Sequence, residues 1–178
     1  MRWGRMNNES PLILTLRLDA ALGARFERER RQHFPPKRNL IPAHLTLFHA
    51  LPGSEEPGII RHLRALADET PPLPLRVSGF RFLGRGVAYE IESPALLTLR
   101  GSLAQHWKPW LTPQDAQGFR PHVTVQNKVE PEAARSLLQH LQAGFEPIDG
   151  SGTGLLLWRY LGGPWELAAE FSFPSDRT

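Results

Sequence analysis

The sequence contains no cysteine. This absence excludes disulfide bonds, thiolate nucleophiles and thiolate metal sites, and it is compatible with a reducing compartment. The chain also lacks any run that approaches the ~18 apolar residues of a membrane span. Its first residues, Met1 to Asn8, carry no apolar core of signal-peptide length. We therefore expect a soluble cytoplasmic protein with no membrane segment.

A strong charge of either sign is lacking as well, since the formal net charge is only +3 and the arginines are spread over many segments. This balance is compatible with a polyanionic partner and equally with an ordinary solvated surface. The chain has 178 residues, of which 40% are apolar and 22% charged, as in one globular domain or two closely packed half-domains. We expect a monomer formed by a single domain over residues 1–178, with frayed ends at residues 1–9 and 174–178.

The sequence does contain an internal repeat. His44-Leu45-Thr46-Leu47 is followed 78 residues later by His122-Val123-Thr124-Val125. At the same offset, residues 59–65 resemble residues 137–143, and residues 81–84 resemble residues 159–162. Three blocks in one register, with no gap, indicate two copies of one unit, which is too long for a solenoid repeat and suits a pseudo-two-fold pair of lobes. We place the two lobes at residues 11–88 and 89–166.

Hydrophobic periodicity predicts the same elements in both copies, and the fold class is therefore α+β. Each pseudo-symmetric lobe is expected to hold a mainly antiparallel sheet and two helices, with an active-site cleft between the lobes. The expected strands are 11–18, 43–51, 73–83, 87–92, 121–129, 155–161 and 165–173, and the expected helices are 20–33, 55–68, 132–142 and one that opens at Ser93-Pro94. Residues 109–121 are expected to form a loop. The glycine-rich segment 150–154 lacks the Lys-Ser/Thr and the helix of a phosphate-binding loop, so we interpret it as a flexible connection.

The two motif strands carry the candidate site. Because side chains alternate along a strand, His44 and Thr46 share one face, and His122 and Thr124 share one face of the second strand. If both strands are regular, these faces also carry candidate substrate-binding residues, namely Phe48 on the first and Arg120, Gln126 and Lys128 on the second. Phe48 is either a stacking partner for a base or ribose or a core residue.

Paired histidines suit phosphoester chemistry. An unperturbed imidazole titrates near pH 6.5, so near neutral pH one histidine can accept a proton while the other donates one. Placement across a pseudo-dyad suits in-line displacement at phosphorus, and each threonine hydroxyl can donate to a non-bridging oxygen. The histidines lack the helical spacing of a zinc-binding pair, and neither motif has a carboxylate cluster nearby. We expect no metal and no cofactor.

The paired His-x-Thr-hydrophobic motifs resemble those of the 2H phosphoesterase superfamily, especially its bacterial 2′-5′ RNA ligase-like branch. The resemblance covers residues 11 to 173 and implies a bilobal fold with metal-free action on 2′,3′-cyclic or 2′-5′ phosphodiesters of RNA ends or nucleotides. It implies that His44 and His122 are the acid/base pair and that Thr46 and Thr124 donate to the phosphate. Related proteins often carry an arginine soon after the second motif. Here Gln126-Asn127-Lys128 follows, so Lys128 or Arg120 would have to replace it, or both are merely exposed charges.

The leading hypothesis is therefore a hydrolase that opens 2′,3′-cyclic phosphodiesters to 2′-phosphates. Reversible 2′-5′ ligation of RNA ends at the same site and an RNA-binding module without turnover are alternatives, and a metal-dependent hydrolase is a weaker one. The near-symmetric motifs do not say which histidine is the base. They also leave open the base preference and the physiological substrate.

Overall fold

The computed structural model describes residues 9–175, and the expected frayed ends lie almost entirely outside that range. The strands are β1 Leu12–Leu18, β2 Leu45–Leu51, β3 Leu73–Phe82, β4 Val87–Glu92, β5 His122–Gln126, β6 Ile148–Tyr160 and β7 Trp165–Ser172. The helices are α1 Ala20–His33, α2 Glu56–Asp68, α3 Pro94–His106, α4 Pro113–Ala116 and α5 Pro131–Gln142. The structure is therefore α+β, as the periodicity predicted. Within residues 9–175 no helix is long and apolar enough to cross a membrane.

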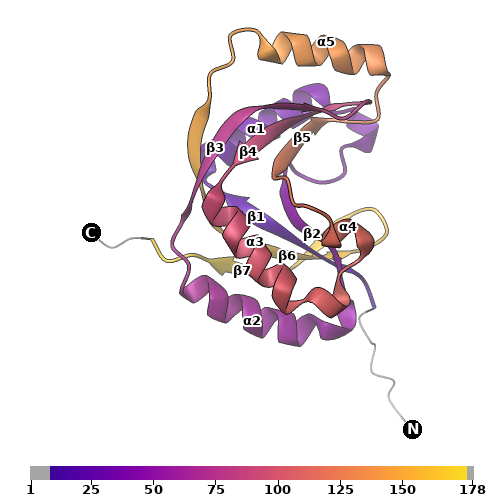
Figure 1. Cartoon of the computed structure of the whole chain (residues 1–178). Helices are drawn as coiled ribbons and strands as arrows, with labels where there is room; N and C mark the ends of the chain where they lie inside the picture. Colours follow the sequence, from indigo (N-terminus) through magenta and orange to yellow (C-terminus); the bar gives the residue numbers. More distant parts are fainter. Residues whose placement is uncertain (1–8, 176–178) are drawn as a thin grey trace.

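All seven strands join one antiparallel sheet in the order β2-β1-β6-β3-β4-β5, and β7 also pairs with β6 (Figure 1). In this strand order, equivalent strands of the two repeats lie at equal distances from the two ends of the sheet. Moving 78 residues along the chain leads from β2 to β5 and from β3 to β6, and β1 and β4 are equivalent by their pairing, because Thr15 pairs with Thr46 as Ala88 pairs with Thr124. The two halves therefore meet at the antiparallel pair of β3 and β6, where a pseudo-two-fold axis relates them.

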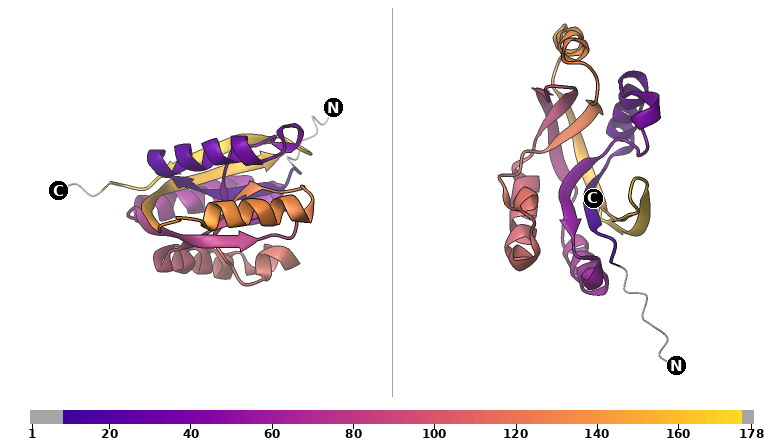
Figure 2. Two further views of the ribbon diagram at one scale, coloured as in Figure 1. Left: turned by 90° about the horizontal axis from the view of Figure 1, so that it is seen from above. Right: turned by 90° about the vertical axis from the view of Figure 1, so that its right-hand side faces the viewer.

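The sheet curls so that its two terminal strands face each other. β2 and β5 lie at opposite ends of the strand order, yet they contact one another directly. In the right-hand view of Figure 2, α1 and α3 lie on opposite sides of the strands, while α5 and α2 cover the two ends of the molecule. Helix α1 follows β1 but packs on β5, and α3 follows β4 but packs Trp107 against Phe48 of β2. The crossed helices tie the two lobes together.

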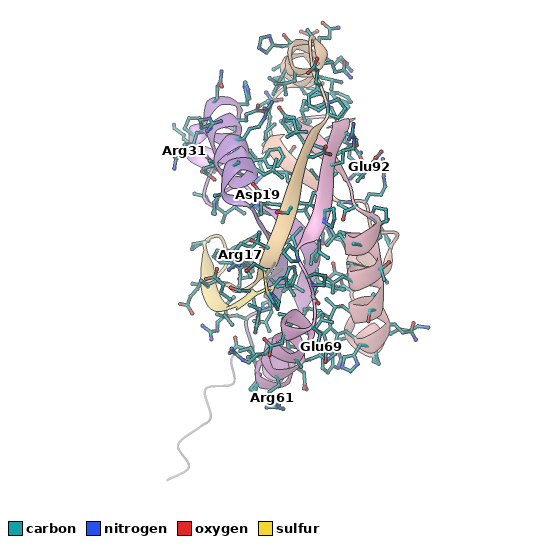
Figure 3. All side chains as sticks on the ribbon, turned by 90° about the vertical axis from the view of Figure 1, so that its left-hand side faces the viewer. Arg17, Asp19, Arg31, Arg61, Glu69 and Glu92 are labelled. Atoms are coloured by element: carbon teal, nitrogen blue, oxygen red, sulfur yellow. The ribbon has the colours of Figure 1, made fainter. Side chains whose placement is uncertain are left out.

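The start of α1 shows how local sequence places an element. Asp19 is the N-cap, and its carboxylate accepts hydrogen bonds from the backbone N–H of Leu22 at 2.9 Å and of Ser151 at 2.7 Å. Leu22 and Phe26 follow at helical spacing and are buried. In Figure 3, Asp19 lies beside β6, whereas Arg31 of the same helix points away from the strands. One side chain thus caps α1 and fixes it to the central strand.

The glycine-rich segment 150–154 is part of β6, so the expectation of a flexible connection is wrong. A Cβ at Gly150 would overlap the side chain of Leu22, and one at Gly154 would overlap the backbone oxygen of Phe171. A Cβ at Gly152 would lie 2.8 Å from the Leu16 side chain. These glycines therefore permit close approach of neighbouring backbone and side chains, which is a use of glycine inside strands.

Replacing Gly154 with alanine is expected to lower the free energy of unfolding by about 1–3 kcal/mol, because the new methyl group meets a backbone atom that cannot rotate away. Gly79 of β3 is the matched control, since a Cβ there meets no atom within 4 Å. Urea unfolding of both variants measures the difference. Equal midpoints for Gly154→Ala and the wild type would contradict the packing argument.

Candidate active site

The two His-x-Thr motifs line one cavity. His44 immediately precedes β2 and His122 is the first residue of β5, so the contact between these strands brings the motifs together. The cavity has a volume of about 440 Å³, and all four predicted catalytic side chains are on its wall. Its lining consists of Pro11, Ile13, His44, Thr46, His49, Ala50, His122, Thr124, Tyr160 and Trp165. The side chains that the repeat predicted to meet do meet.

The imidazoles of the two motifs are held in the same way. Nδ1 of His44 lies 2.8 Å from the carbonyl oxygen of Pro42, and Nδ1 of His122 lies 2.9 Å from that of Arg120. A carbonyl oxygen only accepts, so Nδ1 carries the hydrogen in both rings. Each Nε2 is then available for proton transfer. His44 is also packed against Trp165, with 4.7 Å between the ring centroids.

The surroundings of the two histidines differ in their effect on pKa. Burial lowers the pKa of His44 to about 4, against a smaller opposing effect of the hydrogen bond to Pro42. Burial also lowers the pKa of His122, and the hydrogen bond to the Arg120 carbonyl opposes it. The charge of Arg81 lowers the pKa of His122 further, while Glu90 raises it. The near-symmetric motifs therefore sit in unequal environments.

Two equivalent β-bulges contradict the prediction that Phe48 and Gln126 share the face of the motif histidines. In β2, Thr46 pairs with Thr15 and Phe48 pairs with Leu14, so Leu47 is an extra residue. In β5, Thr124 pairs with Ala88 and Gln126 pairs with Val87, so Val125 is the extra residue, at the offset of 78. A bulge reverses the in-and-out alternation beyond it.

As a result, neither residue is on the cleft face. Phe48 is 0% exposed, and its ring contacts that of Trp107. Gln126 is buried too and does not line the cavity of the histidines. The prediction that these two side chains bind substrate is wrong, because it assumed regular strands.

At each bulge, a buried arginine from a helix donates a hydrogen bond to a backbone carbonyl oxygen. Arg100 of α3 donates from Nε to the carbonyl oxygen of Leu47 at 3.1 Å, and Arg30 of α1 donates from Nη1 to that of Thr124 at 3.1 Å. A bulge interrupts the ladder, and a buried carbonyl without a partner is costly. The two arginines therefore stabilise the irregular backbone that aims the motifs at one another.

The two predicted basic anchors have different positions. Arg120 lies at the rim of the cleft, where Nη2 donates to Glu90 at 3.1 Å and the side chain is 70% exposed. Lys128 is not on the strand face, because β5 ends at Gln126 and Lys128 lies exposed in the following turn with φ 62°. The prediction of Lys128 as a same-face anchor is therefore wrong.

Arg81 is a cleft residue that the sequence reasoning did not select. It projects from β3, donates from Nε to Glu90 at 3.0 Å, and places Nη1 3.4 Å from Nδ1 of His122. Since both of these nitrogens carry hydrogens, this contact is a charge placed beside an imidazole and not a hydrogen bond. The sequence did contain a pattern that marks Arg81, because Arg81 is the first residue of the repeated block at residues 81–84.

His49 and Asp115 were missed for another reason. The bulge in β2 turns His49 back to the cleft, where Asp115 of α4 accepts a hydrogen bond from its Nδ1 at 3.0 Å. Helix α4 lies within the segment 109–121 that was expected to be a loop. No motif marks this pair, because the bulge and a short helix create the contact. Within residues 9–175, no three His, Asp or Glu side chains are grouped to hold a metal ion.

Most of this chain is similar to known proteins. The family model of the 2'-5' RNA ligase superfamily matches residues 18–164. A Bacillus licheniformis protein named as a candidate phosphoesterase is 30% identical over 118 residues, covering 63% of this chain and 68% of that protein. A similarly named protein of Oceanobacillus iheyensis is 26% identical over 152 residues, covering 82% and 88%.

Solved structures share the fold. A Thermus thermophilus protein superposes with a TM-score of 0.67 and 19% identity, covering 94% of this chain and 100% of that one. LigT of E. coli complexed with NADP+ gives a TM-score of 0.57 and 18% identity, covering 92% and 98%. At these identities the likeness concerns the fold alone.

Proposed function

This chain belongs to the 2'-5' RNA ligase superfamily and is a phosphoesterase-type enzyme, and from that premise we propose which phosphoester it cleaves. The proposed reaction is hydrolysis of a 2′,3′-cyclic phosphodiester, at an RNA end or in a nucleotide, to a 2′-phosphate. The observation that carries this proposal is that both histidines and both threonines line the same cavity. Two imidazoles with free Nε2 atoms on one cavity suit a displacement with one proton acceptor and one proton donor.

The reaction balances with these four side chains. A water oxygen attacks phosphorus and gives its proton to Nε2 of one histidine, while the bond from phosphorus to the 3′-oxygen breaks. The second histidine donates its Nε2 proton to that leaving oxygen. The hydroxyl groups of Thr46 and Thr124 donate to the non-bridging oxygens, where negative charge develops.

We assign His44 as the base and His122 as the acid. The burial that lowers the pKa of His44 to about 4 keeps its Nε2 unprotonated and able to accept a proton. The pKa of His122 is lowered as well, but the shift of His44 is the larger one. At a pH above the pKa of His44 and below that of His122, the dominant state therefore has His44 neutral and His122 protonated. The proposed reaction needs this state.

The assignment predicts an acidic optimum. In the free enzyme, kcat/KM should rise with pH as His44 loses its proton near pH 4, and should fall as His122 loses its proton below its ordinary value of 6.5. Measurement of kcat/KM from about pH 3.5 to 9 tests this. A profile that still rises between about pH 7 and 8 would contradict the assignment.

The remaining wall of the cavity suits a base or a ribose. Tyr160 and Trp165 line it together with Pro11 and Ile13, so an apolar and aromatic surface adjoins the reacting groups. Tyr160 is 41% exposed, which leaves its ring accessible to a ligand. Stacking of a base on such a ring contributes about 1–3 kcal/mol.

Replacing Tyr160 with alanine is therefore expected to raise KM for a cyclic nucleotide about tenfold and to change kcat less than about twofold. Leu161 is the control, because it is the next residue, is 51% exposed and does not line the cavity. Steady-state kinetics on both variants decide the point. An equal effect of Leu161→Ala would show that the change in Tyr160→Ala is not a loss of stacking.

The function itself is tested by a panel of 2′,3′-cyclic nucleotides and RNA oligomers with cyclic ends. The expected product is the 2′-phosphate, which is separable from the 3′-phosphate by chromatography. Exclusive release of the 3′-phosphate would mean that the other bond to phosphorus breaks. Tight RNA binding without turnover, unaffected by changes to either histidine, would favour a binding module.

The family description also supports a second candidate, reversible 2′-5′ joining of RNA ends. In that reaction a 5′-hydroxyl would take the place of water, and the same two histidines would exchange the same protons. Incubation of an RNA with a 2′,3′-cyclic end and one with a 5′-hydroxyl end should then yield a 2′-5′ linked product. Hydrolysis without any joined product would exclude the ligase activity.

A further inference from the structure

A second cavity adjoins the first. It has a volume of about 380 Å³ and shares Thr46, His49 and His122 with the cavity of the two motifs. Its lining consists of Thr46, Leu47, His49, Arg81, Arg100, Gln114, Asp115, Gln117, Gly118, Phe119, Arg120 and His122. A ligand whose phosphorus lies between the histidines can therefore extend into this space without leaving the cleft.

The charges around this second cavity are mostly positive. Arg81, Arg100 and Arg120 line it, and among residues 9–175 Asp115 is the single carboxylate on its wall. Glu90 is close by and accepts hydrogen bonds from both Arg81 and Arg120. Three guanidinium groups therefore face two carboxylates, before any proton on the histidines is counted. In the first cavity, the part of the lining beyond the histidines and threonines is instead largely apolar and aromatic, with a proline, an isoleucine, a tyrosine and a tryptophan.

The carboxylate on the wall is not available to a ligand cation. Asp115 has no exposed side-chain surface, and its oxygens accept from the backbone N–H of His49 at 2.8 Å and of Ala50 at 3.0 Å as well as from the His49 ring. Burial alone would raise the pKa of Asp115, but these hydrogen bonds hold it below the ordinary value. Asp115 is therefore ionised, and its carboxylate oxygens already accept hydrogen bonds from His49 and Ala50. It holds the His49 ring in position.

That arrangement orients His49 toward a ligand. Because the carboxylate accepts from Nδ1, the hydrogen of the neutral ring is on Nδ1, and Nε2 is the ring nitrogen that is not used by Asp115. The His49 side chain is 45% exposed, whereas its partner is fully buried. One end of the ring is thus fixed by the protein and the other faces the cleft.

Arg81 brings a partly exposed positive charge to this cavity. Its Nε is bound to Glu90, and its Nη2 has neither exposed surface nor a hydrogen-bond partner among the described residues. The Arg81 side chain as a whole is 21% exposed, so its charge acts on a bound oxyanion in the cavity. Arg100 is already bound to the carbonyl oxygens of Leu47 and Asp115 and contributes charge only.

We infer that the second cavity is a subsite for another phosphate group of the substrate, bound by His49, Arg81 and Arg120. The inference rests on the proposed function and narrows its substrate class to cyclic phosphodiesters that carry a second phosphate. Arginine forks match the oxygens of a phosphate, and a site that adjoins the reacting phosphorus suits a group about one ribose away. Gln114 and Gln117 add neutral donors and acceptors for sugar hydroxyls.

Three substrates test the subsite and identify the kind of phosphate. They are a nucleoside 2′,3′-cyclic phosphate with a 5′-hydroxyl, the same nucleoside with a 5′-phosphate monoester, and a dinucleotide that ends in the cyclic phosphate. We expect kcat/KM at least about tenfold higher for one or both of the last two, the effect of one hydrogen bond to a charged group. Preference for the monoester indicates a terminal 5′-phosphate, and preference for the dinucleotide indicates an internucleotide phosphate.

The two proposals fail in different ways. Turnover of none of the three substrates contradicts the proposed function. Equal kcat/KM for all three, with turnover, leaves that function standing and overturns the subsite.

Variants locate the subsite. His49→Gln and Arg120→Gln are each expected to reduce the preference for the second phosphate about tenfold, through KM and with little change in kcat. Arg120 is largely exposed, so Arg120→Gln remains informative even if His49→Gln folds poorly. His106→Gln is the matched control, because His106 is an exposed histidine of α3 that lines neither cavity. A preference unchanged in both cleft variants would place the second phosphate elsewhere.

Discussion

Replacing His44 with alanine is expected to lower kcat at least about 100-fold on a 2′,3′-cyclic phosphate, the usual scale for loss of one general acid or base. His122→Ala should do the same. Each ring lies on the shared cavity with Nδ1 bound to a carbonyl oxygen, so alanine removes the Nε2 atom that exchanges a proton with the reacting oxygens in the proposed reaction. Single-turnover and steady-state rates measure the loss.

The double variant gives a sharper result than either single one. In the proposed reaction both histidines act in one step, so the double alanine variant should be about as slow as the slower single variant, without a multiplied effect. In His122→Ala, the alkaline fall of kcat/KM should disappear, because the group that titrates there is gone. Thermal unfolding of each variant controls for loss of structure. Full activity in both single variants would contradict the catalytic role proposed for the two histidines.

The second large effect is expected on stability, at Phe48. Replacing Phe48 with alanine should lower the free energy of unfolding by about 3–5 kcal/mol, the range for an aromatic side chain in a well-packed core. Its ring is 0% exposed, lies 5.2 Å from the ring of Trp107, and has the guanidinium carbon of Arg100 at 4.2 Å. Loss of the ring leaves a cavity and removes the surface on which Arg100 packs.

Phe82→Ala is the matched control, because Phe82 is 40% exposed at the end of β3. Its effect should stay within about 1 kcal/mol. Urea unfolding with the slope compared between variants gives both values. If Phe48 faced the cleft instead, Phe48→Ala would raise KM and leave the unfolding midpoint nearly unchanged. That outcome would contradict the bulge in β2.

These two predictions concern residues four positions apart in the same segment, and they separate what periodicity can and cannot predict. His44 and Thr46 precede the bulge, where strict alternation holds, and both line the cleft as the alternation predicts. Phe48 and Gln126 follow the bulges, and both were placed wrongly for the same reason. A bulge depends on hydrogen bonds to the neighbouring strand and to Arg30 or Arg100, which are far away in the sequence.

The glycine-rich segment illustrates a second limit. Composition alone favours a flexible connection at Gly150, Gly152 and Gly154, since glycine costs backbone entropy in a strand. The structure uses them where Leu22, Leu16 and Phe171 approach the backbone of β6 closely. Local sequence does not reveal which neighbours approach that closely.

The amino-acid sequence by itself determined the repeat, and with it the pairing of the two histidines and two threonines, because a duplicated unit folds twice and its equivalent strands occupy equivalent places. It also determined most helices and strands, whose apolar spacing matches their period. The tertiary structure alone decided which further side chains reach the cleft. Bulges, the short helix α4 and the meeting of β2 with β5 place His49, Asp115 and Arg81 there, since those positions follow from hydrogen bonds between distant segments.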